Sequence, residues 1–270
     1  VMIDGLAMVA GGVAAGLFGS LLGLGGGILI VPLLTLGFGL PLLTAVGVSL
    51  VCVIVTSGAA AGVYLEKQVA NLRLGMTLEL FTAIGALGGA TIAFLISEQV
   101  LAGLFGGLLL YVAVTMALRG SASEEAPADV EAGQGTGSFA ESLSAAGYRV
   151  RNLRVAALGS LGAGVVSALL GIGGGTINVP VMHVVMGVPL RVATATSNLM
   201  IGITASAGAI VYLLRGGIDA YVAAPTAVGV FLGASLGSRV AHRIQLPALR
   251  FLFVVVLLYT AWQMLQRAFA

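Results

Sequence analysis

The chain begins with a long stretch that carries no charge. From Gly5 to Tyr64 there is no Asp, Glu, Lys or Arg. An ordinary water-soluble domain is excluded, because such domains are about 25% charged, whereas this chain of 270 residues is 8% charged and 59% hydrophobic. The uncharged segments reach the roughly 20 residues that a helix needs to cross about 30 Å of hydrocarbon. The sequence therefore predicts an integral protein of the lipid bilayer.

A glycine-rich phrase occurs twice in the chain. The stretch "LLGLGGGILIVP" at 21–32 returns as "LLGIGGGTINVP" at 169–180, with residue numbers that differ by 148. The same offset aligns three further pairs: Pro41 with Pro189, Ser49 with Ser197, and Tyr64 with Tyr212. Polar residues and prolines that match without a gap indicate an internal duplication.

The two copies are separated by a polar segment. It is rich in Ala, Gly, Ser and acidic residues and has almost no large apolar residue, a composition typical of a solvated linker that forms no packed core. We expect a first membrane repeat over 1–118, a linker over 119–152 and a second membrane repeat over 153–270.

Each half contains five apolar segments, of which 26–38 and 174–187 are short for a crossing. Cytoplasmic loops collect Lys and Arg, so the charges can decide whether each glycine phrase reverses the chain. With five segments per half, ten of the 12 basic residues fall on one side, whereas four segments per half divide them eight to four. The five-segment arrangement places the linker in the cytoplasm and the N-terminus outside.

An odd number of segments per half makes the two halves inverted relative to each other. We therefore expect an all-α polytopic membrane protein of two inverted repeats, each with about five membrane segments and a glycine-broken helix. Inverted repeats with broken helices are a recurring plan in secondary transporters.

The glycine phrases are candidate substrate sites. Glycine allows a sharp turn of the backbone, and the first N–H groups of the helix that follows have no intrahelical partner and attract anions. The alternative is close helix packing, which is the simpler interpretation for Gly229, Gly233 and Gly237. We name the two phrases the first knot and the second knot, and the predicted site glycines are Gly25, Gly26 and Gly27 in the first and Gly173, Gly174 and Gly175 in the second.

Polar side chains near the knots extend this prediction. Thr176 and Asn178 occur only in the second copy, where the first has isoleucines. Hydroxyl and amide groups in the following segments offer uncharged donors to a substrate, although a helix–helix hydrogen bond is an equal alternative for each. These candidates are Ser49, Thr56, Ser197, Asn198 and Thr204.

Two ionisable residues are candidates for proton coupling. Glu79 lies inside an apolar segment, where ionisable groups are functional candidates, although its nearness to Arg73 favours an interfacial carboxylate. His183 follows the second knot, where a neutral packed histidine is favoured over a proton-coupling group.

Other classes of function have no support in the sequence. There is no HExxH, GxSxG or metal-spaced Cys/His set, so we expect no enzyme, metal site or cofactor. There is no basic stripe with interleaved aromatic residues, so no nucleic-acid partner is expected.

The chain resembles the sulfite exporter TauE/SafE family. The resemblance rests on "GLFGSLLGLGGGILIVPLL" and "GVVSALLGIGGGTINVPVM", and on "PLLTAVGVSL" and "PLRVATATSN" that follow them. It covers about 5–118 and 153–267. It implies a carrier in the bacterial inner membrane for sulfur-containing anions such as sulfite or organosulfonates, for which we expect export. An anion channel and a membrane scaffold without transport are the competing functions.

Overall fold

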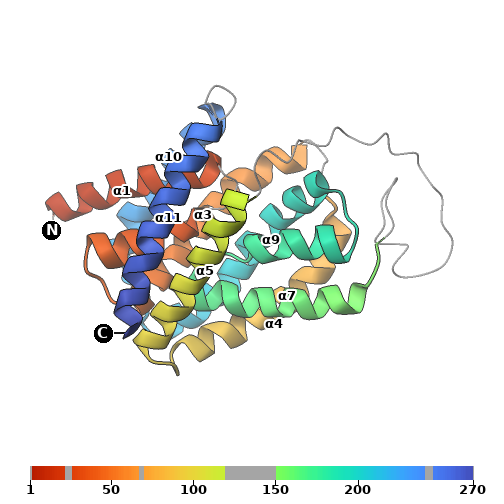
Figure 1. Cartoon of the computed structure of the whole chain (residues 1–270), viewed down its shortest axis with the longest axis horizontal. Coiled ribbons are helices and arrows are strands. Elements are labelled where there is room, and N and C mark those ends of the chain that lie inside the picture. The colour runs from red at the N-terminus through yellow and green to blue at the C-terminus, as the bar shows by residue number, and fades with distance from the viewer. Residues whose placement is uncertain (1, 22–25, 67–69, 119–149, 241–245, 270) are drawn as a thin grey trace.

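The computed structural model describes residues 2–21, 26–66, 70–118, 150–240 and 246–269, and all regular structure within them is helical (Figure 1). Two short π-helical turns, labelled η, each directly follow a short helix. The first repeat contains α1 (Met2–Leu21), α2 (Gly27–Pro32), η1 (Leu33–Gly37), α3 (Leu42–Glu66), α4 (Leu72–Ala93) and α5 (Glu98–Leu118). The second contains α7 (Leu153–Leu170), α8 (Gly175–Pro180), η2 (Val181–Val185), α9 (Leu190–Leu214), α10 (Ala220–Val240) and α11 (Leu246–Phe269).

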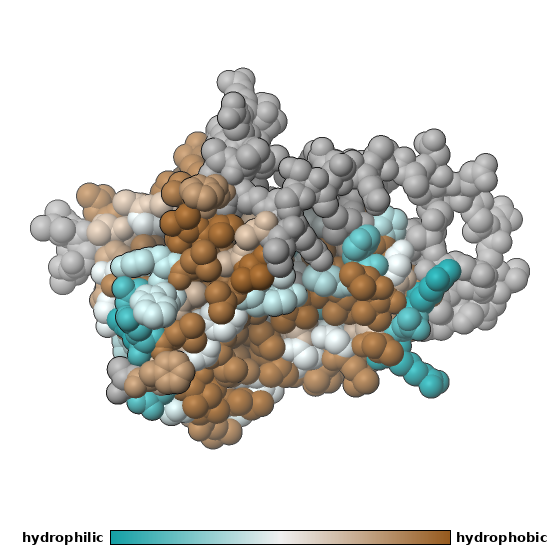
Figure 2. Space-filling model, viewed as in Figure 1, coloured by the Kyte–Doolittle hydropathy of each residue, from teal (hydrophilic) through white to brown (hydrophobic). Residues whose placement is uncertain are grey.

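The long helices have the length and surface of membrane spans. Within the described part of the chain, 6 helices are long and apolar enough to cross a membrane. One face of α4 leaves Met76, Leu80 and Ile84 between 60% and 69% exposed, an arrangement that suits lipid and not water. Apolar side chains predominate over the middle of the face seen in Figure 2, with hydrophilic ones at its two ends. The prediction of an all-α polytopic membrane protein is confirmed.

The predicted duplication recurs in the positions of the helices. Five helices of the first repeat, α2, η1, α3, α4 and α5, each begin 148 residues before a counterpart in the second. α3 and α9 contain 25 residues each and begin at equivalent positions, Leu42 and Leu190. The contacts between helices show the same symmetry. The pair α1 and α10 is equivalent to the pair α7 and α4, and two helices pack on their own counterparts, α3 on α9 and α5 on α11.

Glycines allow the close approach of α1 and α10. A Cβ atom placed on Gly229 or Gly233 would overlap backbone atoms of Val9 or Val13 in α1. In the same way a Cβ on Gly237 would meet Leu17 O at 2.9 Å. The prediction that these three glycines form a helix–helix face is confirmed.

Equivalent helices run in opposite directions where they meet. Gly47, near the start of α3, lies against Gly217 just beyond the end of α9, whereas the Ser57 hydroxyl donates to Asn198 O (2.7 Å) near the start of α9. Likewise Gly103 of α5 lies against Ala268 of α11, and Gly106 against Leu265. A two-fold axis along the membrane normal would make such pairs parallel. The antiparallel pairs thus agree with inverted repeats.

Each glycine knot reverses the chain; in the first repeat Leu33 of η1 returns to contact Gly11 of α1. Val181 contacts Gly159, near the start of α7, and Gly174 contacts Ser167, near its end, so that η2 and α8 return along α7. Arg151 N donates to Met186 O (3.2 Å), which closes the hairpin at its base. The 11 residues of α8 and η2 extend only about 16 Å, less than a full crossing. α1 begins at the left of Figure 1 and α7 at the right, so the two hairpins enter from opposite ends of the molecule.

Candidate functional site

The tips of the two hairpins are built alike. Gly26 precedes α2 with φ 76° and Gly174 precedes α8 with φ 74°. This left-handed conformation is accessible to glycine without a steric cost, which explains why the sequence places glycine at the start of both short helices. Gly174 O then accepts hydrogen bonds from Ile177 N (3.2 Å) and Asn178 N (3.0 Å), and Gly26 O accepts the equivalent pair.

The two tips meet in the interior of the protein. A Cβ on Gly27 would lie 2.6 Å from Gly171 O and 3.2 Å from Ile172 Cα, so the glycine allows backbone to pack on backbone. The Ser49 hydroxyl lies between the tips, 2.7 Å from Gly171 O and 3.3 Å from Gly27 O. The structure thus brings together residues of both knots that are far apart in the chain.

The second knot differs from the first in its polar surroundings. A Cβ on Gly174 would lie 3.5 Å from Ser167 Oγ and 3.6 Å from Asn178 Nδ2, and one on Gly175 would lie 3.5 Å from Ser197 Oγ. We call Ser167, Asn178 and Ser197 the Asn178 group; each is 1% exposed. Their hydroxyl oxygens and both amide atoms of Asn178 have no hydrogen-bond partner among the described residues. Native proteins leave few buried polar atoms unpaired, so these groups are available to a ligand or to water.

Sequence reasoning identified Asn178 and Ser197 but missed Ser167. The available signal was a serine in the apolar segment before the second knot, at a position where the first repeat has Gly19. Two predicted site positions cannot be compared with the structure: Gly25 lies outside the described residues, and so does the side chain of Thr176.

The remaining predicted hydroxyl and amide groups make bonds within the protein. Thr56 Oγ1 donates to Val53 O (3.0 Å). Asn198 Nδ2 donates to Thr194 O (3.0 Å), while the backbone carbonyl of Asn198 accepts from the Ser57 hydroxyl. The side chains of Thr56 and Asn198 thus bond within their own helices, and a substrate role for them stays a prediction.

Glu79 lies in the interior and not on an exposed interfacial face. It is 4% exposed, and its Oε1 accepts a hydrogen bond of 2.8 Å from the Thr204 hydroxyl of α9. Oε2 has no partner within the described part of the chain. The carboxyl is thus enclosed by protein, and its position near the membrane interface stays a prediction. The sequence could not reveal the contact, because it joins α4 to a helix of the other repeat.

One face of α9 connects Glu79 to the second knot. Ser197, Ile201 and Thr204 are four and three residues apart and so share a face of the helix. Ile201 packs against Gly173 and Gly175. Seven residues of helix separate Ser197 from Thr204, about 10 Å. The same helix therefore contacts the second knot and carries the hydroxyl that binds Glu79.

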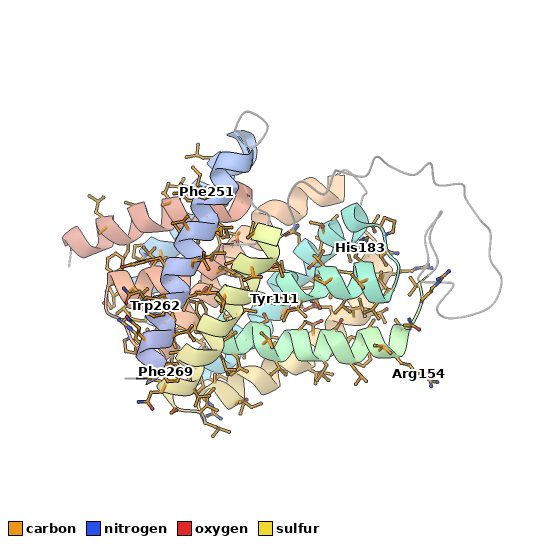
Figure 3. All side chains as sticks on the ribbon, in the orientation of Figure 1. Tyr111, Arg154, His183, Phe251, Trp262 and Phe269 are labelled. Carbon is orange, nitrogen blue, oxygen red and sulfur yellow. The ribbon has the colours of Figure 1, made fainter. Side chains whose placement is uncertain are left out.

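His183 lies away from these groups. It is exposed on η2, with Nδ1 2.9 Å from Val188 O. The expectation that it is packed in the interior is wrong, because the turn places the imidazole on the outer side of the hairpin. Figure 3 shows it at the same end of the molecule as Arg154.

A separate cavity of about 240 Å³ lies between α3, α5 and α11. The Glu98 carboxylate accepts from Leu42 N (2.8 Å) at the start of α3. Arg267 donates to Thr35 O (3.1 Å) at the end of the first hairpin. Both charged groups bind backbone at helix ends, which gives them a structural role. The candidate substrate site therefore stays at the knots.

Comparison with known proteins shows which family the chain belongs to. The family model described as "Sulfite exporter TauE/SafE" matches residues 8–264. The chain belongs to the sulfite exporter TauE/SafE family. This membership and the multi-pass helical fold make it a member of a membrane transporter family.

Several relatives of this TauE/SafE protein carry transporter names. It is 25% identical over 268 residues to "Probable membrane transporter protein YunE" of Bacillus subtilis (strain 168), with 96% of each chain covered. It is 28% identical to "Probable membrane transporter protein YdhB" of the same organism, with 81% of this chain and 82% of YdhB covered. "Probable membrane transporter protein MamO" of Magnetospirillum gryphiswaldense is 27% identical, with 97% of this chain and 45% of MamO covered. No solved structure is significantly similar.

Proposed function

We propose that the protein is a secondary transporter that moves small sulfur-containing anions, sulfite or organosulfonates such as sulfoacetate, across the bacterial inner membrane. The observation that carries this proposal is the meeting of the two hairpin tips, one from each repeat, at Gly27 and Gly171. In transporters, broken helices of two repeats meet at a midplane substrate site, and one repeat moves against the other to give alternating access.

The chemistry of the site suits a compact oxyanion. Such an anion presents several acceptor oxygens, which backbone N–H groups and uncharged hydroxyl or amide donors can bind without a fixed positive charge. We place the substrate against both knots and the polar groups of α8 and α9, with Asn178 and Ser197 as the side chains whose donors remain free.

We further propose that Glu79 couples transport to protons. α7 and α9 pack against the helix that carries Glu79. The charged residues of α7 and α9 that could influence Glu79 are two arginines. Arg154 is exposed in the first turn of α7, and Arg191 lies about 20 Å along α9 before Thr204. The described partner of the carboxyl is the Thr204 hydroxyl. A neutral Glu79 would remove the repulsion between an anion and a second buried negative charge.

The positions of the basic residues support a cytoplasmic linker, whereas export as the direction of transport is proposed from the exporter description of the family. Five segments per half give an inverted pair of repeats with a strongly one-sided distribution of Lys and Arg. The domain division proposed is a first repeat over 1–118, the linker over 119–152 and a second repeat over 153–270.

The test is transport by the purified full-length protein in proteoliposomes. Radiolabelled sulfoacetate and sulfite should enter saturably and exchange with unlabelled substrate on the other side, and Gly174→Val should abolish both activities. Because that variant strains a left-handed residue, Asn178→Ala serves as a second variant with a normal backbone. Flux far above carrier turnover without exchange would indicate an anion channel, and no flux of any tested anion would favour a scaffold; either result overturns the proposal.

A further inference from the structure

The unpaired buried polar atoms gather on one side of the pseudo-symmetric fold. Within the described residues, they occur on α4, α7, α8 and α9, four helices that pack on one another. The equivalent helices α10, α1, α2 and α3 carry none among their described side chains. The residues concerned are Glu79, Ser160, Ser167, Asn178 and Ser197.

The equivalent positions of the other repeat are apolar or satisfied. Four of them have no polar side chain: Ala227, Gly12, Gly19 and Ile30 replace Glu79, Ser160, Ser167 and Asn178. The fifth is Ser49, whose hydroxyl binds the backbone of both knots. The two repeats thus share their backbone arrangement, but among the described residues only one of the two related sets of helices carries buried polar atoms without a hydrogen-bond partner.

Buried polar atoms without a hydrogen-bond partner in the protein need one from outside the chain. A buried donor or acceptor left unpaired destabilises a protein, so several together need a ligand or ordered water. The Asn178 group offers an amide, with donors and an acceptor, and two hydroxyls around Gly174 and Gly175. The first knot has instead the isoleucine side chains of Ile28 and Ile30, both buried.

We infer that the substrate binds asymmetrically, as a small oxyanion held by the Asn178 group against the second knot, while the first knot serves as a packing surface. This inference rests on the proposed function and names the half of the site that contacts the anion. Transport with inverted repeats needs equivalent movements of the two halves, and it does not need equivalent ligand contacts.

The first test measures binding of sulfoacetate and sulfite to the purified protein by titration calorimetry at fixed ionic strength. Asn178→Ile and Ser167→Gly install the residues of the first repeat, and each should weaken binding by about tenfold, as expected for one lost hydrogen bond. The matched control is Thr226→Val, because that buried hydroxyl is satisfied by Val222 O at 2.7 Å; its affinity should equal that of the wild type. Wild-type affinity in both variants overturns the inference, whereas no binding by the wild-type protein overturns the proposed function itself.

The second test measures chemical access to the two equivalent positions and its protection by the anion. In a Cys52→Ala background, which removes the single cysteine, Asn178→Cys and Ile30→Cys place thiols at equivalent positions that are 1% and 0% exposed. A negatively charged methanethiosulfonate reagent should label Asn178→Cys and not Ile30→Cys, and sulfoacetate should slow the labelling several-fold. Equal labelling at both positions, no labelling at Asn178→Cys, or labelling that the anion does not slow would each overturn the asymmetric site.

Discussion

The hydroxyl of Thr204 donates a 2.8 Å hydrogen bond to Oε1 of Glu79 and so joins the two repeats at a buried carboxyl. Thr204 lies on the face of α9 that also carries Ser197 at the second knot. Glu79 and the proposed substrate site are therefore connected through a single helix, and the proposed coupling of protons to the anion rests on this connection.

Removing the hydroxyl should destabilise the protein. Thr204→Val keeps the shape of the side chain and leaves Glu79 Oε1 without its donor, which should lower stability by about 1–3 kcal/mol. Thermal unfolding in detergent measures the effect. The double variant with Glu79→Leu should recover stability, because it removes the carboxyl as well; a double variant no more stable than Thr204→Val would contradict the explanation.

Glu79→Gln should separate proton coupling from substrate movement. The amide keeps the size of the side chain and cannot ionise, so a pH gradient should no longer drive accumulation of substrate in proteoliposomes, while exchange at equal pH persists. Thr91→Val is the control, since its exposed hydroxyl bonds only to Leu87 O of its own helix. Gradient-driven accumulation by Glu79→Gln at the wild-type level would exclude Glu79 from coupling.

A methyl group at Gly27 should disrupt the meeting of the knots. In Gly27→Ala the new carbon would lie 2.6 Å from Gly171 O, and overpacking of this kind costs about 1–3 kcal/mol. Gly88→Ala, also within a helix but with no atom within 4 Å of the added carbon, should be neutral or slightly stabilising. The melting temperatures of the two variants test this, and equal values would show that the tips do not pack as described.

The antiparallel contact of α5 and α11 can be trapped covalently. The Cβ position at Gly103 lies 3.4 Å from Ala268 Cβ, close to the spacing that a disulfide requires. Gly103→Cys with Ala268→Cys, in the Cys52→Ala background, should cross-link under mild oxidation, detected by a mobility shift after cleavage between the repeats. Gly103→Cys with Trp262→Cys is the control and should not cross-link, because residue 262 lies about 9 Å of helix away from 268.

The sidedness of the membrane can be tested at two exposed positions. Ser97→Cys, between α4 and α5, should be labelled from outside the cell, and Arg151→Cys, at the base of the second hairpin, only after permeabilisation. Both residues are exposed. Labelling of both from the same side would contradict the five-segment arrangement, because it would place the bases of α5 and α7 on one face.

The class of protein and its repeat were determined by sequence alone. Low charge and long apolar segments can be recognised in short windows of sequence, and a constant offset of 148 residues reveals the duplication. The reversal at each knot also followed from the sequence, because glycine permits it and the basic residues distribute accordingly.

The tertiary structure decided which of the candidate residues meet. Ser49 binds Gly171 across 122 residues, and Glu79 binds Thr204 across 125. Such contacts depend on how helices of different repeats pack, and no local pattern encodes that packing. The different surroundings of the two knots have both origins: Asn178 is part of the second glycine phrase and was visible in the sequence, whereas packing brings Ser167 of α7 and Ser197 of α9 to the same place.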